Sequence, residues 1–244
     1  MKLAQSLSPD NSDRVLFFNK SENGVVAVYA NQSAVWLMVN GVLQTAIELN
    51  TPYRPLLPHC FVMMLPLLHD KEPARVLELG AGAAALQRYL TFSHPSVAIK
   101  SIEHNEIIIE ATKTCFPEFA ALNIVRDDAY HYVDEMINTS KLFDWVMVDL
   151  FYGADSPLLK NTESFVKKLH KLVNDQGWLI INLLTNEKNQ LKSITETVAE
   201  TFAQKTFLFA VPDMQNHILM CKKSGSSIFT FPDEIEVHNL ALQI

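Results

Sequence analysis

The stretch Arg75-Val-Leu-Glu-Leu-Gly80-Ala-Gly82-Ala-Ala-Ala-Leu86 decides how this chain is expected to fold. An apolar strand runs into a Gly-X-Gly turn, and a helix-forming run follows the turn. A second apolar run, residues 97–102, ends at Glu103, about 20 residues after Gly82. In open α/β sheets this layout binds a nucleotide-like ligand, because glycines let the backbone approach the ligand and the acidic side chain hydrogen-bonds a ribose.

The composition is that of an ordinary globular protein. Its 244 residues can bury a sizeable core, and 48% of them are apolar. No apolar run reaches the roughly 20 residues of a membrane span, and the first residues lack a signal-peptide core, so we expect a cytoplasmic protein that does not act at a membrane. The three isolated cysteines indicate neither disulfides nor a zinc site, and we expect no metal. A net charge of −7 argues against nucleic acid as a partner and is compatible with a cationic small-molecule substrate.

Residues 14–49 consist of apolar runs separated by turn signals. Asn23-Gly24 and Asn40-Gly41 each lie between two such runs, and both residue types tolerate the positive φ of a tight hairpin turn. The pattern predicts a small N-terminal β-sheet. Prolines at 52, 55 and 58 mark a linker, and a helix is expected over about 59–69. We therefore expect an N-terminal β-domain over 1–55, a ligand-binding domain over 56–225 and a tail over 226–244.

From residue 75 onward the chain alternates between strand and helix patterns. Strands are predicted over 76–79, 97–103, 123–126, 145–149 and 178–184, and helices over 83–92, 105–116, 129–138, 162–173 and 188–203. Such alternation predicts a mostly parallel sheet covered on both faces. The runs 205–211 and 217–222, joined by a short polar turn, predict an antiparallel hairpin that completes a seven-stranded sheet. A reversed last strand is typical of the class I S-adenosylmethionine-dependent methyltransferase fold, and Ala85, where a third glycine would stand, disfavours a dinucleotide.

Five short motifs, in this order and spacing, resemble the spermidine synthase (polyamine aminopropyltransferase) family over residues 14–222. They are Asn40-Gly-Val-Leu-Gln44, Val76-Leu-Glu-Leu-Gly-Ala-Gly82, Ile102-Glu-His-Asn105, Arg126-Asp-Asp-Ala129 and Phe143-Asp-Trp-Val-Met-Val-Asp149. The resemblance implies a cofactor that is S-adenosylmethionine or its decarboxylated form, with S-adenosylhomocysteine or methylthioadenosine as product. It also implies a homodimer formed partly through the N-terminal sheet.

The same resemblance assigns roles to individual residues. Gly80 and Gly82 would border the methionine-derived part of the cofactor, Glu103 would hold the ribose hydroxyls and Asp128 would accept from the adenine amino group. Asp149 would lie beside the reacting centre. Gln44 and His59 fall where the family lines its cofactor and amine pockets.

The chain departs from the family at three acidic positions. Where the family has Asp-Ser-Ser-Asp after the fourth strand of its main sheet, this chain has Asp149-Leu-Phe-Tyr152, so Tyr152 replaces a carboxylate. The family turn Gly-Gly-Gly-Asp-Gly is here Gly80-Ala-Gly-Ala-Ala84, and its Tyr-His-Glu is Pro58-His-Cys60. A multiply protonated polyamine needs several carboxylates in a desolvated site, and the attacking nitrogen needs a base because an ammonium has no lone pair. The losses therefore favour a different acceptor.

Several alternatives stay open at this point. Asp128 fits a helix N-cap as well as an adenine contact, and Tyr152 fits a packing role as well as a substrate-facing one. His59 is either a packed helix histidine or a base. Three functions are compatible with the sequence: a transferase with an acceptor other than putrescine, a true spermidine synthase in which Asp155, Glu48 or a tail residue supplies the lost acidity, and a non-catalytic protein that binds an adenosyl ligand.

Overall fold

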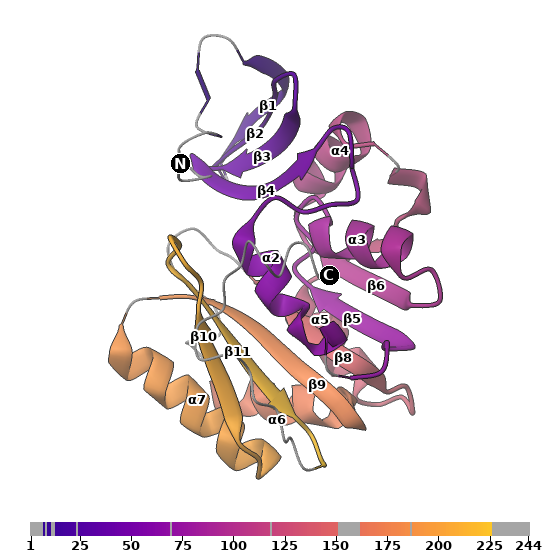
Figure 1. Ribbon diagram of the computed structural model, residues 1–244, viewed down its shortest axis with the longest axis vertical. Helices are drawn as coiled ribbons and strands as arrows, with labels where there is room; N and C mark the ends of the chain where they lie inside the picture. Colours follow the sequence, from indigo (N-terminus) through magenta and orange to yellow (C-terminus); the bar gives the residue numbers. More distant parts are fainter. Residues whose placement is uncertain are drawn as a thin grey trace.

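The computed structural model describes residues 7, 9–10, 13–22, 24–68, 70–117, 119–150, 162–185 and 187–225. These residues form two sheets (Figure 1). The first has four antiparallel strands in the order β1-β2-β3-β4, and the second has seven in the order β10-β11-β9-β8-β5-β6-β7. The predicted α/β fold, with a mostly parallel sheet, an antiparallel C-terminal hairpin and a small N-terminal sheet, is confirmed. No helix within the described residues has the length and apolarity to span a bilayer.

The N-terminal sheet is built from two hairpins. Its strands are β1 (Arg14–Ser21), β2 (Gly24–Ala30), β3 (Ala34–Val39) and β4 (Val42–Glu48). Between β3 and β4, Asn40 has a φ of 51° and Gly41 a φ of 77°. Positive φ at both central residues is what a type I′ hairpin turn requires, and this explains why Asn-Gly stands there.

The seven-stranded sheet follows the predicted alternation. Its elements are β5 (Arg75–Leu79), α3 (Ala85–Ser93), β6 (Ala98–Glu103), α4 (Glu106–Cys115), β7 (Ile124–Arg126), α5 (Ala129–Met136), β8 (Phe143–Val148), α6 (Thr162–Leu172), β9 (Val173–Leu184), α7 (Lys188–Phe202), β10 (Thr206–Ala210) and β11 (Asn216–Lys222), with a short 3₁₀ turn over Phe119–Ala121. Strands β8, β5, β6 and β7 are parallel neighbours, whereas β11 runs antiparallel to β9. The carboxyl ends of β5, β6 and β8 therefore meet at one edge of the sheet, where ligands bind in open α/β folds.

Alternate residues of the central strands face two separate apolar layers. Val76, Trp145 and Trp178 belong to one buried cluster with residues of α3 and of the short helix α2 (Pro58–Met63). Leu77 and Val146 belong to a second cluster with residues of α5, α6 and α7. Burial on both faces explains why these strands read as near-continuous apolar runs.

The helix predicted over about 59–69 is shorter than expected. Helix α2 ends at Met63, and the 3₁₀ turn η1 (Leu65–Leu68) follows it. Pro66 is the physical reason, because it lacks the N–H that a continued helix needs and it disfavours helical backbone at the residue before it. A second difference is β9, which begins at Val173 directly after α6, five residues earlier than predicted.

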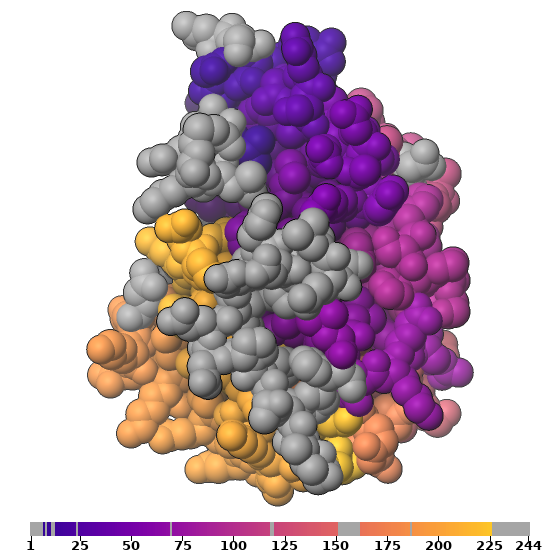
Figure 2. All heavy atoms as spheres, in the orientation of Figure 1, coloured from indigo at the N-terminus to yellow at the C-terminus, as the bar shows by residue number. Residues whose placement is uncertain are grey.

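The N-terminal sheet packs against the main domain on both of its faces. Trp36 and Ala46 share a buried cluster with residues of α2 and α3, while Val28 shares another with Ile108 and Ala111 of α4. Figure 2 shows the same contact from outside, where the purple N-terminal strands meet the magenta segment along a continuous surface. The expected tail over 226–244 lies outside the described residues.

Candidate active site

The turn after β5 depends on its two glycines. Gly80 has a φ of 92°, and a Cβ built on it would lie 2.1 Å from the carbonyl oxygen of Asp149. Only glycine permits so close an approach, which brings the ends of β5 and β8 together. Gly82 has a φ of 52°. The glycines are thus required by the turn itself, and they leave its backbone open to a ligand.

Side chains from two distant segments hold the N–H groups of this turn. The Gly82 N–H donates to Glu103 Oε2 at 3.0 Å, and the Ala83 N–H donates to the Thr45 hydroxyl at 3.1 Å. Glu103 also accepts from the Asn105 N–H at 2.9 Å through its other oxygen. His104 Nδ1 lies 3.4 Å from the same oxygen. Glu103, which is only 6% exposed, is therefore fixed at the end of β6, and its Oε2 keeps one lone pair. A carboxylate held in this way can accept from the hydroxyls of a ribose.

Asp149 follows β8 and joins His59 of helix α2. Its Oδ1 accepts from the Asn182 side-chain amide at 2.7 Å, and its Oδ2 lies 3.8 Å from His59 Nε2. Among the described residues, no lysine or arginine lies within 4.0 Å of Asp149 or Glu103 in an ion pair. His104 lies 3.4 Å from Glu103, and the hydrogen bond between them raises the pKa of His104. A cationic ligand could therefore approach Asp149 without displacing a lysine or arginine of the described residues.

His59 is buried and held by few hydrogen bonds. Burial lowers the pKa of its imidazole, and the charge on Asp149 opposes that shift. Its Nδ1 is buried without a hydrogen-bond partner in the described structure, while its Nε2 lies 3.5 Å from Cys60 Sγ. Burial also raises the pKa of the Cys60 thiol well above its usual range, so Cys60 stays a neutral thiol. A neutral imidazole with a free ring nitrogen can accept a proton or a hydrogen bond from a ligand.

Asp128 lies beside Glu103 at the start of α5. Its side chain accepts from the N–H groups of Tyr130 (2.9 Å) and His131 (3.0 Å), so the predicted N-cap is confirmed. The adjacent Asp127 N–H donates to the Glu103 carbonyl at 3.1 Å, which anchors this turn to β6. The contact between Asp128 and an adenine stays a prediction. A capping carboxylate has free lone pairs for it.

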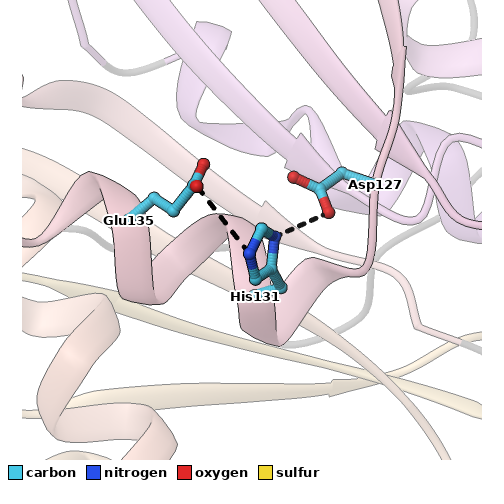
Figure 3. Close-up of side chains that lie close together, drawn as sticks. All are labelled: Asp127, His131 and Glu135. Carbon is cyan, nitrogen blue, oxygen red and sulfur yellow. Dashed lines mark hydrogen bonds and ion pairs between the residues drawn. The ribbon is translucent and has the colours of Figure 1, made fainter.

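Asp127, His131 and Glu135 form a cluster on the exposed side of α5 (Figure 3). His131 Nδ1 lies 2.9 Å from Asp127, and its Nε2 lies 3.7 Å from Glu135. The hydrogen bond to Asp127 and the charges of both carboxylates raise the pKa of His131. Asp127 is hydrogen-bonded to one ring nitrogen and Glu135 forms an ion pair with the other, and Asp127 Oδ1 also accepts from the Asp128 N–H at 2.8 Å.

Gln44 occupies an irregular position in β4. Leu37 pairs with Thr45 and Met38 pairs with Leu43, so Gln44 is the extra residue of a β-bulge. Bulges re-aim side chains and are common next to functional sites. Gln44 is half-buried and directly precedes the threonine that holds the glycine turn, which places its backbone beside the site.

Glu78, Thr45 and Asn182 were not singled out by the sequence reasoning. Glu78 lies in β5, is 2% exposed and accepts from the Ser101 hydroxyl. Burial raises its pKa to about 8, and the charges of Asp149 and Glu103 act in the same direction. A polar residue inside an apolar strand run is the signal that could have identified Glu78 and Asn182. Thr45 carries no such signal.

Tyr152 and Asp155 lie outside the described residues. Their expected roles stay predictions. Of the other predicted residues, the structure links Gly80, Gly82, Glu103, Asp149 and His59 directly through the contacts given above. Asp128 and Gln44 reach this set through their neighbours Asp127 and Thr45.

The spermine/spermidine synthase domain matches residues 57–229, well over half of the chain. The chain belongs to the spermine/spermidine synthase family. The match covers the glycine turn, Glu103, Asp128 and Asp149, and the family resemblance given by the sequence motifs is confirmed.

Similar proteins include both aminopropyltransferases and methyltransferases. The polyamine aminopropyltransferase of Desulforudis audaxviator is 28% identical over 151 residues, 59% of this chain, and the chain spans only about half (52%) of that protein. A probable spermidine synthase from Corynebacterium glutamicum has the same fold, with a TM-score of 0.74 at 18% identity over 94% of this chain and 86% of that one. Human methyltransferase-like protein 13, solved in complex with SAH, superposes with a TM-score of 0.60 at 17% identity over 76% of this chain and 88% of that one.

Proposed function

We propose that this protein is an S-adenosyl-dependent transferase of the spermidine synthase-like group whose acceptor is not putrescine. The proposal combines two features of the site. The part that would hold an adenosyl ligand keeps its acidic and glycine residues in supporting geometry. The part that would hold a polyamine has apolar, buried side chains where the family has carboxylates.

The residues around the glycine turn fit an adenosyl ligand. Glu103, fixed by Gly82 and Asn105, would accept from the ribose hydroxyls, and Asp128 would accept from the adenine amino group. Gln44 and the turn itself would border the methionine-derived part. Glu103 and Asp149 are two carboxylates without a lysine or arginine partner among the described residues, which suits a sulfonium cation.

The observation that carries the choice of acceptor is the burial of Ala83 and Cys60. Ala83 stands where the family turn has an aspartate, is fully buried and belongs to the apolar cluster formed by the N-terminal sheet and α4. Cys60 stands where the family has a glutamate, is 3% exposed and belongs to the apolar cluster under α2. Neither environment would accommodate a charge, because an unpaired buried carboxylate costs several kcal/mol.

The residues present can still assist a transfer reaction. A bound sulfonium supplies an activated carbon and a good leaving group, so the protein has mainly to align the nucleophile and exclude water. Asp149 would orient the nucleophile or accept its proton, and His59, whose Nε2 lies 3.8 Å from Asp149, would be the second titratable group beside it. A deprotonated or weakly basic acceptor suits this site better than a fully protonated diamine. As with its family, we propose that the protein acts as a homodimer.

Glu48 is one of the residues that could supply the missing acidity. It ends β4, and its carboxylate accepts from the Thr51 hydroxyl, three residues along the chain. Glu78, which interacts electrostatically with Asp149, is another candidate for the second hypothesis, a true spermidine synthase. That residue is held neutral up to a pH of about 8 by its burial.

Isothermal titration calorimetry with four ligands tests the proposal. These are S-adenosylmethionine, decarboxylated S-adenosylmethionine, S-adenosylhomocysteine and methylthioadenosine. We expect at least one of these ligands to bind. Glu103→Ala should weaken its affinity about 100-fold, because the loss of the carboxylate leaves both the Gly82 N–H and the ribose hydroxyls without their acceptor. Asp175→Asn is the matched surface control, because Asp175 is 85% exposed at the opposite end of β9 from Asn182.

Each result has a distinct meaning. If no adenosyl compound binds, the proposed function is wrong. Turnover of putrescine with the decarboxylated cofactor would instead make the protein a true spermidine synthase. Tight binding with no turnover of any amine or other small acceptor would point to a binding protein.

A further inference from the structure

Two asparagines form a hydrogen-bonded chain that ends on Asp149. Asn182 donates through Nδ2 to Asp149 Oδ1 at 2.7 Å, and Asn216 donates through Nδ2 to Asn182 Oδ1 at 2.9 Å. Both asparagines are 8% exposed. They come from neighbouring antiparallel strands, β9 and β11, near the edge of the sheet at which Asp149 lies. Such a chain requires three side chains from three separate segments to be aligned.

The direction of this chain follows from the chemistry of its ends. A carboxylate only accepts hydrogen bonds, so Asn182 has to present its NH₂ group to Asp149 and turn its carbonyl oxygen away. The carbonyl oxygen is buried and needs a donor, which the NH₂ group of Asn216 provides. Asn216 therefore fixes the orientation of Asn182, and Asn182 fixes that of the carboxylate.

The structure contains a second aspartate that shows what a purely structural arrangement looks like. Asp70 accepts from Trp178 Nε1 at 2.7 Å and forms an ion pair with Lys222 at 2.8 Å. Its charge is neutralised within the protein. Asp149 is held by a neutral amide instead. Among the described residues its ion-pair partner is His59, and burial lowers the pKa of that imidazole. One carboxylate oxygen is thus anchored while the charge of the group stays available.

We propose that Asn182 is a positioning residue which, supported by Asn216, holds the Asp149 carboxylate toward a cationic centre of the bound ligand. This inference rests on the proposed adenosyl-binding function and adds to it. The asparagine pair would set the preference of the site for a sulfonium over the neutral thioether that remains after transfer. In that role it would also favour release of the product.

The test compares a charged ligand with its uncharged counterpart. Calorimetry of the wild-type protein with S-adenosylmethionine and with S-adenosylhomocysteine gives the ratio of their dissociation constants. If the protein takes the decarboxylated cofactor, that compound and its own thioether replace the pair. We expect the wild-type protein to favour the sulfonium, and Asn182→Leu to reduce this preference about tenfold, the usual effect of losing a hydrogen bond to a charged group.

Asn216 provides a second variant that never touches Asp149. In Asn216→Asp the new carboxylate cannot donate to the Asn182 carbonyl, and it competes with Asp149 for the Asn182 NH₂ group. This variant should lose part of the sulfonium preference. Asn216→Ala should lose less, because Asn182 keeps its orientation toward the carboxylate. Thr185→Val, which removes the hydrogen bond from Thr185 to Gln190 near the same end of β9, is the matched control and should keep the full preference.

The outcomes separate the inference from the proposed function. If the wild-type protein binds neither ligand, both are overturned. If it binds both ligands with equal affinity, or if Asn182→Leu and Asn216→Asp keep the wild-type ratio, the proposed function stands and the inference is wrong. A purely structural role would weaken both ligands equally or lower only the thermal midpoint of unfolding, which is recorded for every variant.

Discussion

Replacing Glu78 by glutamine is expected to make the stability of the protein much less dependent on pH. Glu78 is 2% exposed in the middle of β5, and its carboxyl accepts from the Ser101 hydroxyl. Burial, assisted by the charges of Asp149 and Glu103, raises the pKa of Glu78 from an ordinary value of 4.5 to about 8. Glutamine keeps the shape and the acceptor for Ser101 but has no proton to lose.

The size of the effect follows from linkage between protonation and folding. Between pH 4.5 and about 8 the folded protein keeps a proton on Glu78 that the unfolded chain has lost. The free energy of unfolding therefore falls as pH rises, by about 1.4 kcal/mol per pH unit. Burial of Glu78 costs little below pH 4.5 and about 5 kcal/mol above pH 8. From pH 5.5 to 8.5, the variant should gain about 3 kcal/mol relative to the wild-type protein.

Urea unfolding followed by tryptophan fluorescence, at pH 5.5, 7 and 8.5, measures this difference. Glu196→Gln, which removes a carboxylate 59% exposed on α7, is the matched control and should follow the wild-type curve. Any constant cost of glutamine packing cancels because only the change with pH is compared. If Glu78→Gln and the wild-type protein lose stability in parallel over this range, the buried carboxyl is not protonated and the reasoning is refuted.

Three further substitutions test the rest of the site. Gly80→Ala should lower the free energy of unfolding by at least about 3 kcal/mol in urea, because the new Cβ would overlap the carbonyl of Asp149. Gly41→Ala is the control: Gly41 also has a positive φ but has open space around it, so the loss should be about 1–2 kcal/mol. Similar losses in the two variants would argue against the close approach at Gly80. Asp128→Ala should lower the free energy of unfolding by about 1 kcal/mol, because the helix cap is lost. Asp128→Asn should keep the cap but weaken adenosyl binding. Unfolding followed by circular dichroism measures the capping role, and calorimetry measures the adenine contact. Glu103→Gln leaves one acceptor oxygen for two backbone N–H groups and should weaken adenosyl binding at least tenfold; unchanged affinity in calorimetry would exclude a ribose contact.

Much of the fold could be predicted from local sequence patterns. Strands buried on both faces have continuous apolar runs, and Asn40-Gly41 has the conformational freedom that its hairpin turn requires. Asp128 could be placed because an aspartate before an amphipathic run is a common helix cap. The prediction failed at helix α2, where the apolar run continued but Pro66 prevented a regular helix beyond Met63.

The parts of the site that the sequence did not predict depend on contacts between distant segments. Thr45 is 38 residues away from the Ala83 N–H that it accepts from, and Asn182 is 33 residues away from Asp149. No periodicity or motif records such pairings. They arise only when strand order is known, since β9 lies next to β8 and carries Asn182 to the same edge of the sheet.

The proposed change of acceptor would involve the N-terminal sheet as well as the glycine turn. Three segments fix the turn: the Asp149 carbonyl beside Gly80, the Glu103 carboxylate on Gly82 and the Thr45 hydroxyl on Ala83. Ala83 is enclosed by an apolar cluster to which strands β2, β3 and β4 contribute. The Thr45 hydroxyl of this sheet already accepts from the Ala83 N–H, and the cluster around Ala83 is otherwise apolar, so an aspartate at this position would be poorly paired. The alanine in the turn and the packing of the N-terminal strands therefore form one structural unit, which supports the proposal of an acceptor other than a polyamine.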